Sequence, residues 1–222
     1  MNLRAFFNRA LYRQLAAEAL GSLLLMSALT GSAVLAGRLA GGNAALVLLA
    51  TSLVTGAMLF VLTVMLAPVS AAHLNPAVTL VEAWSWRMQR RRAPCFIMAQ
   101  CAGALVGLLI AWLIFSQPAP ATPAGGARWV GEFLNAFGLL SVYLFTAKSA
   151  LTTRAALLGC YLAIAFWFTG TTSCANPAIT LAQGLAAWNG ASGVADTASA
   201  ILAQLAGGSV AYGTYRGIIR EQ

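Results

Sequence analysis

Charged residues are scarce in this 222-residue chain, and acidic residues are the scarcest of them. Only 8% of the residues are charged, with 13 Lys and Arg against 5 Asp and Glu, and the formal net charge is +8. A typical soluble domain has about 25% charged residues. Apolar residues make up 60% of the chain, and its mean hydropathy is +0.79. A soluble globule cannot bury so much apolar surface, so the composition predicts a lipid-embedded protein and argues against disorder.

Histidine and cysteine, two common metal ligands, are also rare, with one His and four Cys in the chain. The cysteines lie in or beside apolar segments, without the spacing of a zinc site or a disulfide framework. They are Cys95, Cys101, Cys160 and Cys174. No nucleophile–base pair is evident either. We therefore expect no metal, no cofactor and no enzymatic activity.

Six apolar stretches are long enough to cross the hydrocarbon core, which takes about 20 residues of helix. They run over about residues 14–36, 43–67, 94–115, 129–148, 153–172 and 194–215. Two further stretches, about 75–88 and 176–188, are too short to cross and suit re-entrant half-helices. The sequence predicts an all-α membrane protein of six transmembrane helices and two half-helices, forming one membrane domain over residues 1–222.

The basic residues are distributed unevenly between the two sides of this predicted bundle. Only Arg38 and Arg128 fall on one side. The other side receives Arg4, Arg9, Arg13, Arg87, Arg90, Arg91, Arg92, Lys148, Arg154, Arg216 and Arg220. The positive-inside rule places this richer side, with both termini, in the cytoplasm, and compact loops favour a bacterial plasma membrane. Basic residues at the ends of apolar runs also argue against a nucleic-acid partner.

Three motifs recur in the same order in two halves of the chain, about residues 14–115 and 129–215. Each half has a Glu in its first helix, an Asn-Pro-Ala before its half-helix and an Ala-Gln-x-x-Gly in its third helix. Because three crossings separate the halves, the second half is inverted relative to the first. The two Asn-Pro-Ala copies are therefore expected to enter from opposite sides and to meet near the bilayer midplane.

Each Asn-Pro-Ala copy is expected to begin a helix, because Asn is a favoured N-cap and Pro suits the first helical position. Non-helical backbone at membrane depth is tolerated only inside protein or along a watery cavity, so residues 70–74 and 171–175 are expected to line one. Asn amides would donate hydrogen bonds there and backbone carbonyls would accept them. The positive ends of two facing helices repel cations, which favours an uncharged solute.

With these motifs the chain resembles the aquaporin (major intrinsic protein) family from about Gln14 to Tyr215. The resemblance implies a right-handed six-helix bundle with a pore in every subunit of a homotetramer, set in a lipid bilayer. It also implies passive flux of water, glycerol-like or other small uncharged solutes. The pore motifs are then Asn75, Pro76, Ala77, Asn176, Pro177 and Ala178.

Four further polar residues lie near these motifs. Glu18 and Glu132 are predicted to be buried carboxylates that accept hydrogen bonds from the re-entrant loops, as structural groups rather than proton carriers. His73 either faces the pore or packs as a hydrogen-bonded loop residue, and the sequence leaves both readings open. Cys174 is expected to line the pore beside Asn176.

The filter positions depart from the water-selective members of the family, which carry an arginine three residues after the second Asn. Here that position is Ile179, and the other three positions by spacing are Thr55, Ile164 and Ser173. A slip of one turn stays open for Thr55 and Ile164. We expect a filter without charge, aromatic ring or imidazole, wider and more apolar than a water filter. Some bacterial channels for arsenic or antimony hydroxides are similar around the second motif.

Two alternatives to a passive channel remain at this point. Secondary transporters also use inverted repeats and broken helices, but neither Asn-Pro-Ala segment has a carboxylate beside the break, and Glu82 lies seven residues after Asn75. A channel-like fold retained for adhesion would instead have an occluded pore.

Overall fold

The computed structural model describes residues 8–116, 126–186 and 193–220, and it is helical throughout apart from the connections. The long helices are α2 (Arg9–Leu39), α3 (Ala44–Ser70), α5 (Ala93–Phe115), α6 (Gly126–Phe145), α7 (Leu151–Thr169) and α9 (Val194–Arg220). The short ones are α4 (Pro76–Trp84), α8 (Pro177–Ala186) and the 3-10 turn η1 (Arg90–Arg92). Within these ranges the predicted six long and two short helices are confirmed. Arg4, the ends of the predicted domain and residues 187–188 of the second predicted half-helix lie outside the described residues.

Four of the described helices are long and apolar enough to cross a membrane by length and composition alone. These are α2, α3, α7 and the continuous stretch Arg90–Phe115 that includes α5. α6 and α9 have 20 and 27 residues, which is also long enough, but they carry more polar groups. In α6, Arg128, Glu132 and Asn135 are buried inside the bundle. Mean hydropathy understates such a helix because its polar residues face protein rather than lipid.

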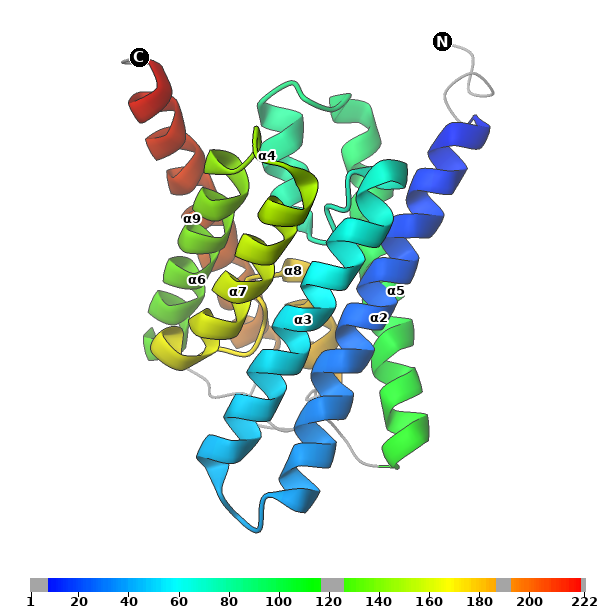
Figure 1. The fold of residues 1–222 in the computed structure, drawn as a ribbon, viewed down its shortest axis with the longest axis vertical. Coiled ribbons are helices and arrows are strands. Elements are labelled where there is room, and N and C mark those ends of the chain that lie inside the picture. The colour runs from blue at the N-terminus through cyan, green and yellow to red at the C-terminus, as the bar shows by residue number, and fades with distance from the viewer. Residues whose placement is uncertain (1–7, 117–125, 187–192, 221–222) are drawn as a thin grey trace.

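The two halves of the bundle repeat the same packing. α2 packs against α3 and α5, α6 packs correspondingly against α7 and α9, and contacts between α3 and α7 join the halves. The start of α2 and the end of α9 lie at the same end of the bundle, with α4 toward that end and α8 toward the other (Figure 1). This is the inverted arrangement that the repeated motifs predict.

Small residues let the paired helices approach closely at equivalent places in the two halves. A Cβ added to Gly103 of α5 would lie 2.1 Å from the carbonyl oxygen of Ala19 on α2. A Cβ added to Gly207 of α9 would lie 2.3 Å from the carbonyl oxygen of Phe133 on α6. Only glycine permits this backbone contact, which brings the first and third helix of each half together around its half-helix.

Candidate functional site

Asn75 and Asn176 each cap the half-helix that follows them. The side-chain oxygen of Asn75 accepts a hydrogen bond from the Ala77 N–H at 2.8 Å, and that of Asn176 accepts one from Ala178 at 3.0 Å. The proline after each Asn is the first helical residue, where no intrahelical donor is needed. Each cap therefore fixes the orientation of its Asn amide at the tip of the half-helix.

The two tips are joined by a reciprocal pair of hydrogen bonds. The Asn75 amide nitrogen donates to the carbonyl of Ala175 at 2.9 Å, and the Asn176 amide nitrogen donates to the carbonyl of Leu74 at 2.7 Å. Each motif thus binds the loop of the other half. The two sequence motifs, about one hundred residues apart, meet inside the bundle as the inverted repeat requires.

The backbone before each Asn adopts the left-handed region without glycine. Ala72 and Leu74 have φ values of 48° and 51°, and Cys174 and Ala175 have φ values of 60° and 50°. Such residues cost of order 1–3 kcal/mol each, and they persist where surrounding contacts determine the conformation. Here the crossed asparagine bonds hold the strained backbone in place, because the carbonyls of Leu74 and Ala175 accept them.

Glu18 is fully buried and anchors the first re-entrant loop. Its carboxylate accepts hydrogen bonds from the Ser70 hydroxyl at 2.6 Å and from the backbone N–H groups of His73 and Leu74 at 3.0 and 2.7 Å. The Gln100 amide donates a fourth at 2.7 Å. Both carboxylate oxygens are therefore used.

Glu132 occupies the equivalent place in the second half but has different partners. It accepts hydrogen bonds from the Ser173 hydroxyl and, at 2.8 Å, from the Gln204 amide. Its other oxygen has no hydrogen-bond partner and lies 3.7 Å from the Arg128 guanidinium, which also pairs with Asp196. Arg128 is thus held between α6 and α9 by two carboxylates.

A small cavity of about 30 Å³ lies beside the joined tips. Its wall is formed by Leu25, Leu59, Thr63, Ala72, His73, Leu74, Asn75, Val78, Leu139, Tyr143, Leu158, Leu162, Cys174 and Asn176. A cavity needs at least about 10–15 Å³ to hold a water molecule, so this one is large enough for water. Both asparagines therefore border a small, mainly apolar chamber with a few polar groups.

His73 lies on this wall and is also packed. Its Nδ1 is 3.1 Å from the Thr79 hydroxyl, and its ring lies against Phe96 with 5.4 Å between the ring centroids. His73 therefore combines the two positions that the sequence left open, since it is a hydrogen-bonded loop residue that also borders the cavity. Cys174 lies on the same wall and is otherwise buried.

Three of the four filter positions taken from spacing face the interior. Thr55, Ser173 and Ile179 are each 0% exposed, and the Thr55 hydroxyl is bound to the Thr51 carbonyl at 2.7 Å. The Ser173 hydroxyl is engaged with Glu132. These groups are uncharged, as the sequence predicts.

The assignment of Ile164 to the filter is wrong. Its side chain is 60% exposed, on the outer face of α7 that also carries the exposed Leu157 and Phe168. Leu162, 1% exposed, lies on the cavity wall, and the buried Phe166 lies one turn further along. A shift of two residues turns a side chain by about 200° around a helix, so it moves from one face to the opposite one. Phe166 also brings an aromatic ring to the inward face, where none was expected.

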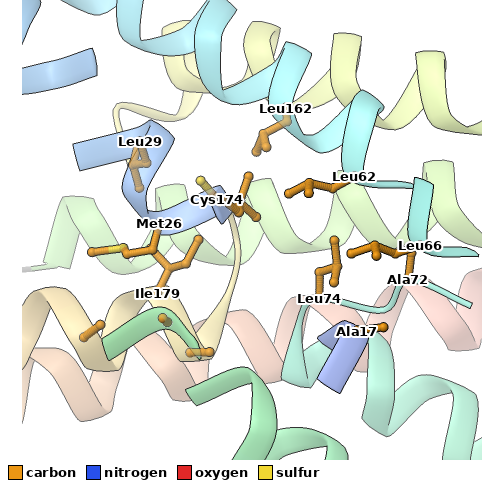
Figure 2. Close-up of a cluster of buried hydrophobic side chains, with 14 of the residues drawn as sticks. Ala17, Met26, Leu29, Leu62, Leu66, Ala72, Leu74, Leu162, Cys174 and Ile179 are labelled. Atoms are coloured by element: carbon orange, nitrogen blue, oxygen red, sulfur yellow. The ribbon is translucent and has the colours of Figure 1, made fainter. Parts of the chain in front are cut away.

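The width expected of the filter also differs from the structure. Ile179, Phe166 and Met26 belong to one buried apolar cluster that also contains Cys174 and Leu29. Met26, Leu29 and Ile179 are drawn on the same side of Cys174 (Figure 2). Met26 and Ile179 are both 0% exposed, so no water-sized space lies beside either side chain. Sequence reasoning missed Met26, because it carries no motif and its apolar neighbours give it no distinguishing signal.

Comparison with known proteins identifies the family of this bundle. A family model described as "Major intrinsic protein" matches residues 6–149. The chain is also 38% identical over 216 residues to aquaglyceroporin AqpS of Rhizobium meliloti (strain 1021), covering 95% of this chain and 91% of that protein. The chain belongs to the major intrinsic protein family. Members of this family are channels rather than enzymes, so this major intrinsic protein is a passive channel, and the transporter alternative is not favoured.

Other similarities are consistent with this membership. Aquaporin NIP1-4 of Oryza sativa subsp. japonica is 44% identical over 85 residues, which cover 36% of this chain and 31% of that protein. The structure of the aquaglyceroporin from Plasmodium falciparum matches with a TM-score of 0.79 at 20% identity, covering 94% of this chain and 97% of that one. This major intrinsic protein therefore has the aquaporin fold.

Proposed function

We propose that this major intrinsic protein conducts glycerol-sized uncharged solutes and water through the passage beside Asn75 and Asn176. The observation that carries the proposal is the pair of crossed asparagines bordering a small cavity. Each amide group has two donor hydrogens, and the crossed bond uses one of them. The second is available to a hydroxyl or water oxygen that loses its hydration in the passage.

The polarity of the passage supports an uncharged solute. Thr55 and Ser173 are neutral and Ile179 is apolar, so no described filter residue offers a counter-ion. On the second half, Arg128 is paired with Asp196 and Glu132, and the Arg154 guanidinium lies over the Tyr143 ring. Small polyols fit this chemistry, and so do uncharged metalloid hydroxides. The name of the relative AqpS, an aquaglyceroporin, agrees with the same solute class.

The assembly and orientation in the membrane are part of the proposal. We propose a homotetramer in a cell (plasma or inner) membrane, with both termini in the cytoplasm. The common end of α2 and α9 carries most of the basic residues, which supports this orientation. Each subunit has its own cavity, so transport does not require a pore between subunits.

A matched pair of α7 variants tests the function. Purified protein in liposomes is exposed to gradients of water, glycerol, urea and arsenite, and vesicle swelling is recorded. Leu162→Trp adds bulk to the cavity wall, whereas Ile164→Trp adds the same bulk to the outer face. We expect the wild type and Ile164→Trp to conduct and Leu162→Trp to be blocked. A wild type no faster than empty liposomes for every solute would reject the proposal in favour of an occluded, adhesive protein.

A further inference from the structure

Cys174 belongs both to the cavity wall and to a cluster of packed apolar side chains. The outer end is taken as the end where α2 stops and α3 begins. Cys174 and Asn176 border the cavity, whereas Met26, Phe166 and Ile179 are not among its lining residues. These three side chains are 0–1% exposed and lie in the same buried cluster as Cys174. A water-sized sphere therefore does not touch the side chains of Met26 and Ile179.

Met26 is the most adaptable of the residues at this level. It belongs to the same buried cluster as Ile179 but comes from a different helix, and these two helices, α2 and α8, are in contact. Methionine is unbranched, with three rotatable bonds, so it fills irregular spaces and changes shape easily. Ile179 is branched at Cβ and sits in the first turn of α8, which limits its rotamers.

We infer that Met26 is a specificity-determining residue, whose side chain closes the outer half of the passage against Ile179 and sets the size of solute that passes. This inference rests on the proposed function. Its physical basis is volume: Ile179 leaves space at the filter that Met26 occupies. A solute passes when the Met26 side chain changes rotamer, and the space it vacates limits the solute.

A series of polyols of increasing size tests this role. Swelling rates for urea, glycerol, erythritol and ribitol are compared in wild type, Met26→Ala and Met26→Phe. We expect Met26→Ala to raise the glycerol rate by about tenfold, equivalent to about 1.4 kcal/mol off the barrier, and to admit the larger polyols. Met26→Phe should lower the glycerol rate and leave the urea rate less affected.

Two controls separate a change of the passage from general loosening. Leu140→Ala removes a fully buried side chain from the second apolar cluster, on α6, and should leave the size limit unchanged. Met98→Ala removes a methionine that is exposed on α5 and should also have no effect. Ile179→Ala widens the opposite wall and should reproduce Met26→Ala, which keeps the test usable if one variant fails to fold.

The outcomes for Met26 and for the channel itself are distinct. An unchanged size limit in folded Met26→Ala and Ile179→Ala, with a conducting wild type, overturns the inference about Met26 alone. The same holds if Leu140→Ala shifts the limit as far as Met26→Ala does. If neither the wild type nor any widened variant conducts a solute, the proposed function fails.

Discussion

At the residue scale, the two buried carboxylates hold the re-entrant loops in different ways. Glu18 uses both oxygens and accepts two backbone N–H groups of the first loop. Glu132 accepts a hydroxyl and an amide, while its second oxygen faces Arg128 without a hydrogen bond. The loops differ in length, four residues (71–74) against six (170–175), so the second loop does not repeat the N–H contacts of the first. The first loop is therefore attached to its acid by its backbone, and the second by side chains.

Replacing Glu18 by Gln should destabilise the protein more than replacing Glu132 by Gln. A Gln at 18 keeps one acceptor oxygen and places an NH₂ group against a donor, and each bond to a charged group is worth about 1.5–3 kcal/mol. At 132 the second oxygen has no hydrogen-bond partner to lose, and Arg128 keeps Asp196. Apparent melting temperatures of the two variants in one detergent provide the comparison. Equal losses would contradict the asymmetry.

Cys174→Ser should abolish inhibition by mercurials. Cys174 borders the cavity, so a bound mercury atom would fill space that a solute needs. The other cysteines do not border it, and Cys160 is exposed on α7. Swelling with and without mercuric chloride measures the effect. A variant with Ala at the other three positions should keep the full wild-type sensitivity, and persistent inhibition of Cys174→Ser would remove this residue from the passage.

At the scale of elements, the sequence determines which segments are helical better than which face of a helix points inward. Apolar length and the Asn-Pro pairs predict all eight main helices of the described residues, and the repeated motifs predict their inverted order. The filter residue of α7 could not be obtained by counting back from Asn176. The six-residue connection that follows α7 changes the phase of the helix, so Ile164 falls on the outer face. Counting residues from a motif predicts which face of a neighbouring helix a side chain occupies only when the length of the connecting loop is known.

Glycine contacts between the first and third helix of each half supply a second prediction at this scale. Gly103→Ala should lower the melting temperature markedly, because its Cβ would lie 2.1 Å from the Ala19 carbonyl oxygen and the two backbones would have to separate. Gly37→Ala is the matched control, since nothing beyond its own stretch of helix lies within 4 Å of the added Cβ, and Ala favours helix by up to about 1 kcal/mol. Thermal unfolding of both variants by circular dichroism decides the matter. Similar losses would mean that close approach of α2 and α5 is not what Gly103 provides.

At the scale of the whole molecule, the exclusion of ions has to come from the fold rather than from a filter cation. Arg128 is neutralised by two carboxylates, and Arg38, at the end of α2, donates to the Phe115 carbonyl. The two half-helix N-termini add a positive potential at the passage, about +0.5 charge each. Because the crossed asparagines hold these ends together, both act on one point of the passage. Dehydration of an ion in the apolar surroundings adds to this barrier.

Asn176→Asp should therefore turn the channel into a cation leak. A carboxylate cannot donate to the Leu74 carbonyl, so the crossed bond is lost, and its charge of −1 offsets the combined charge of about +1 at the two tips. We expect faster proton and potassium flux into liposomes, read with a pH-sensitive dye and a potassium electrode, while glycerol flux falls or stays unchanged. Asn75→Asp should behave alike, because it loses the equivalent bond to Ala175. If both folded variants stay impermeable to cations, the half-helix ends are not the barrier, and the apolar constriction at Met26 and Ile179 must exclude ions by itself.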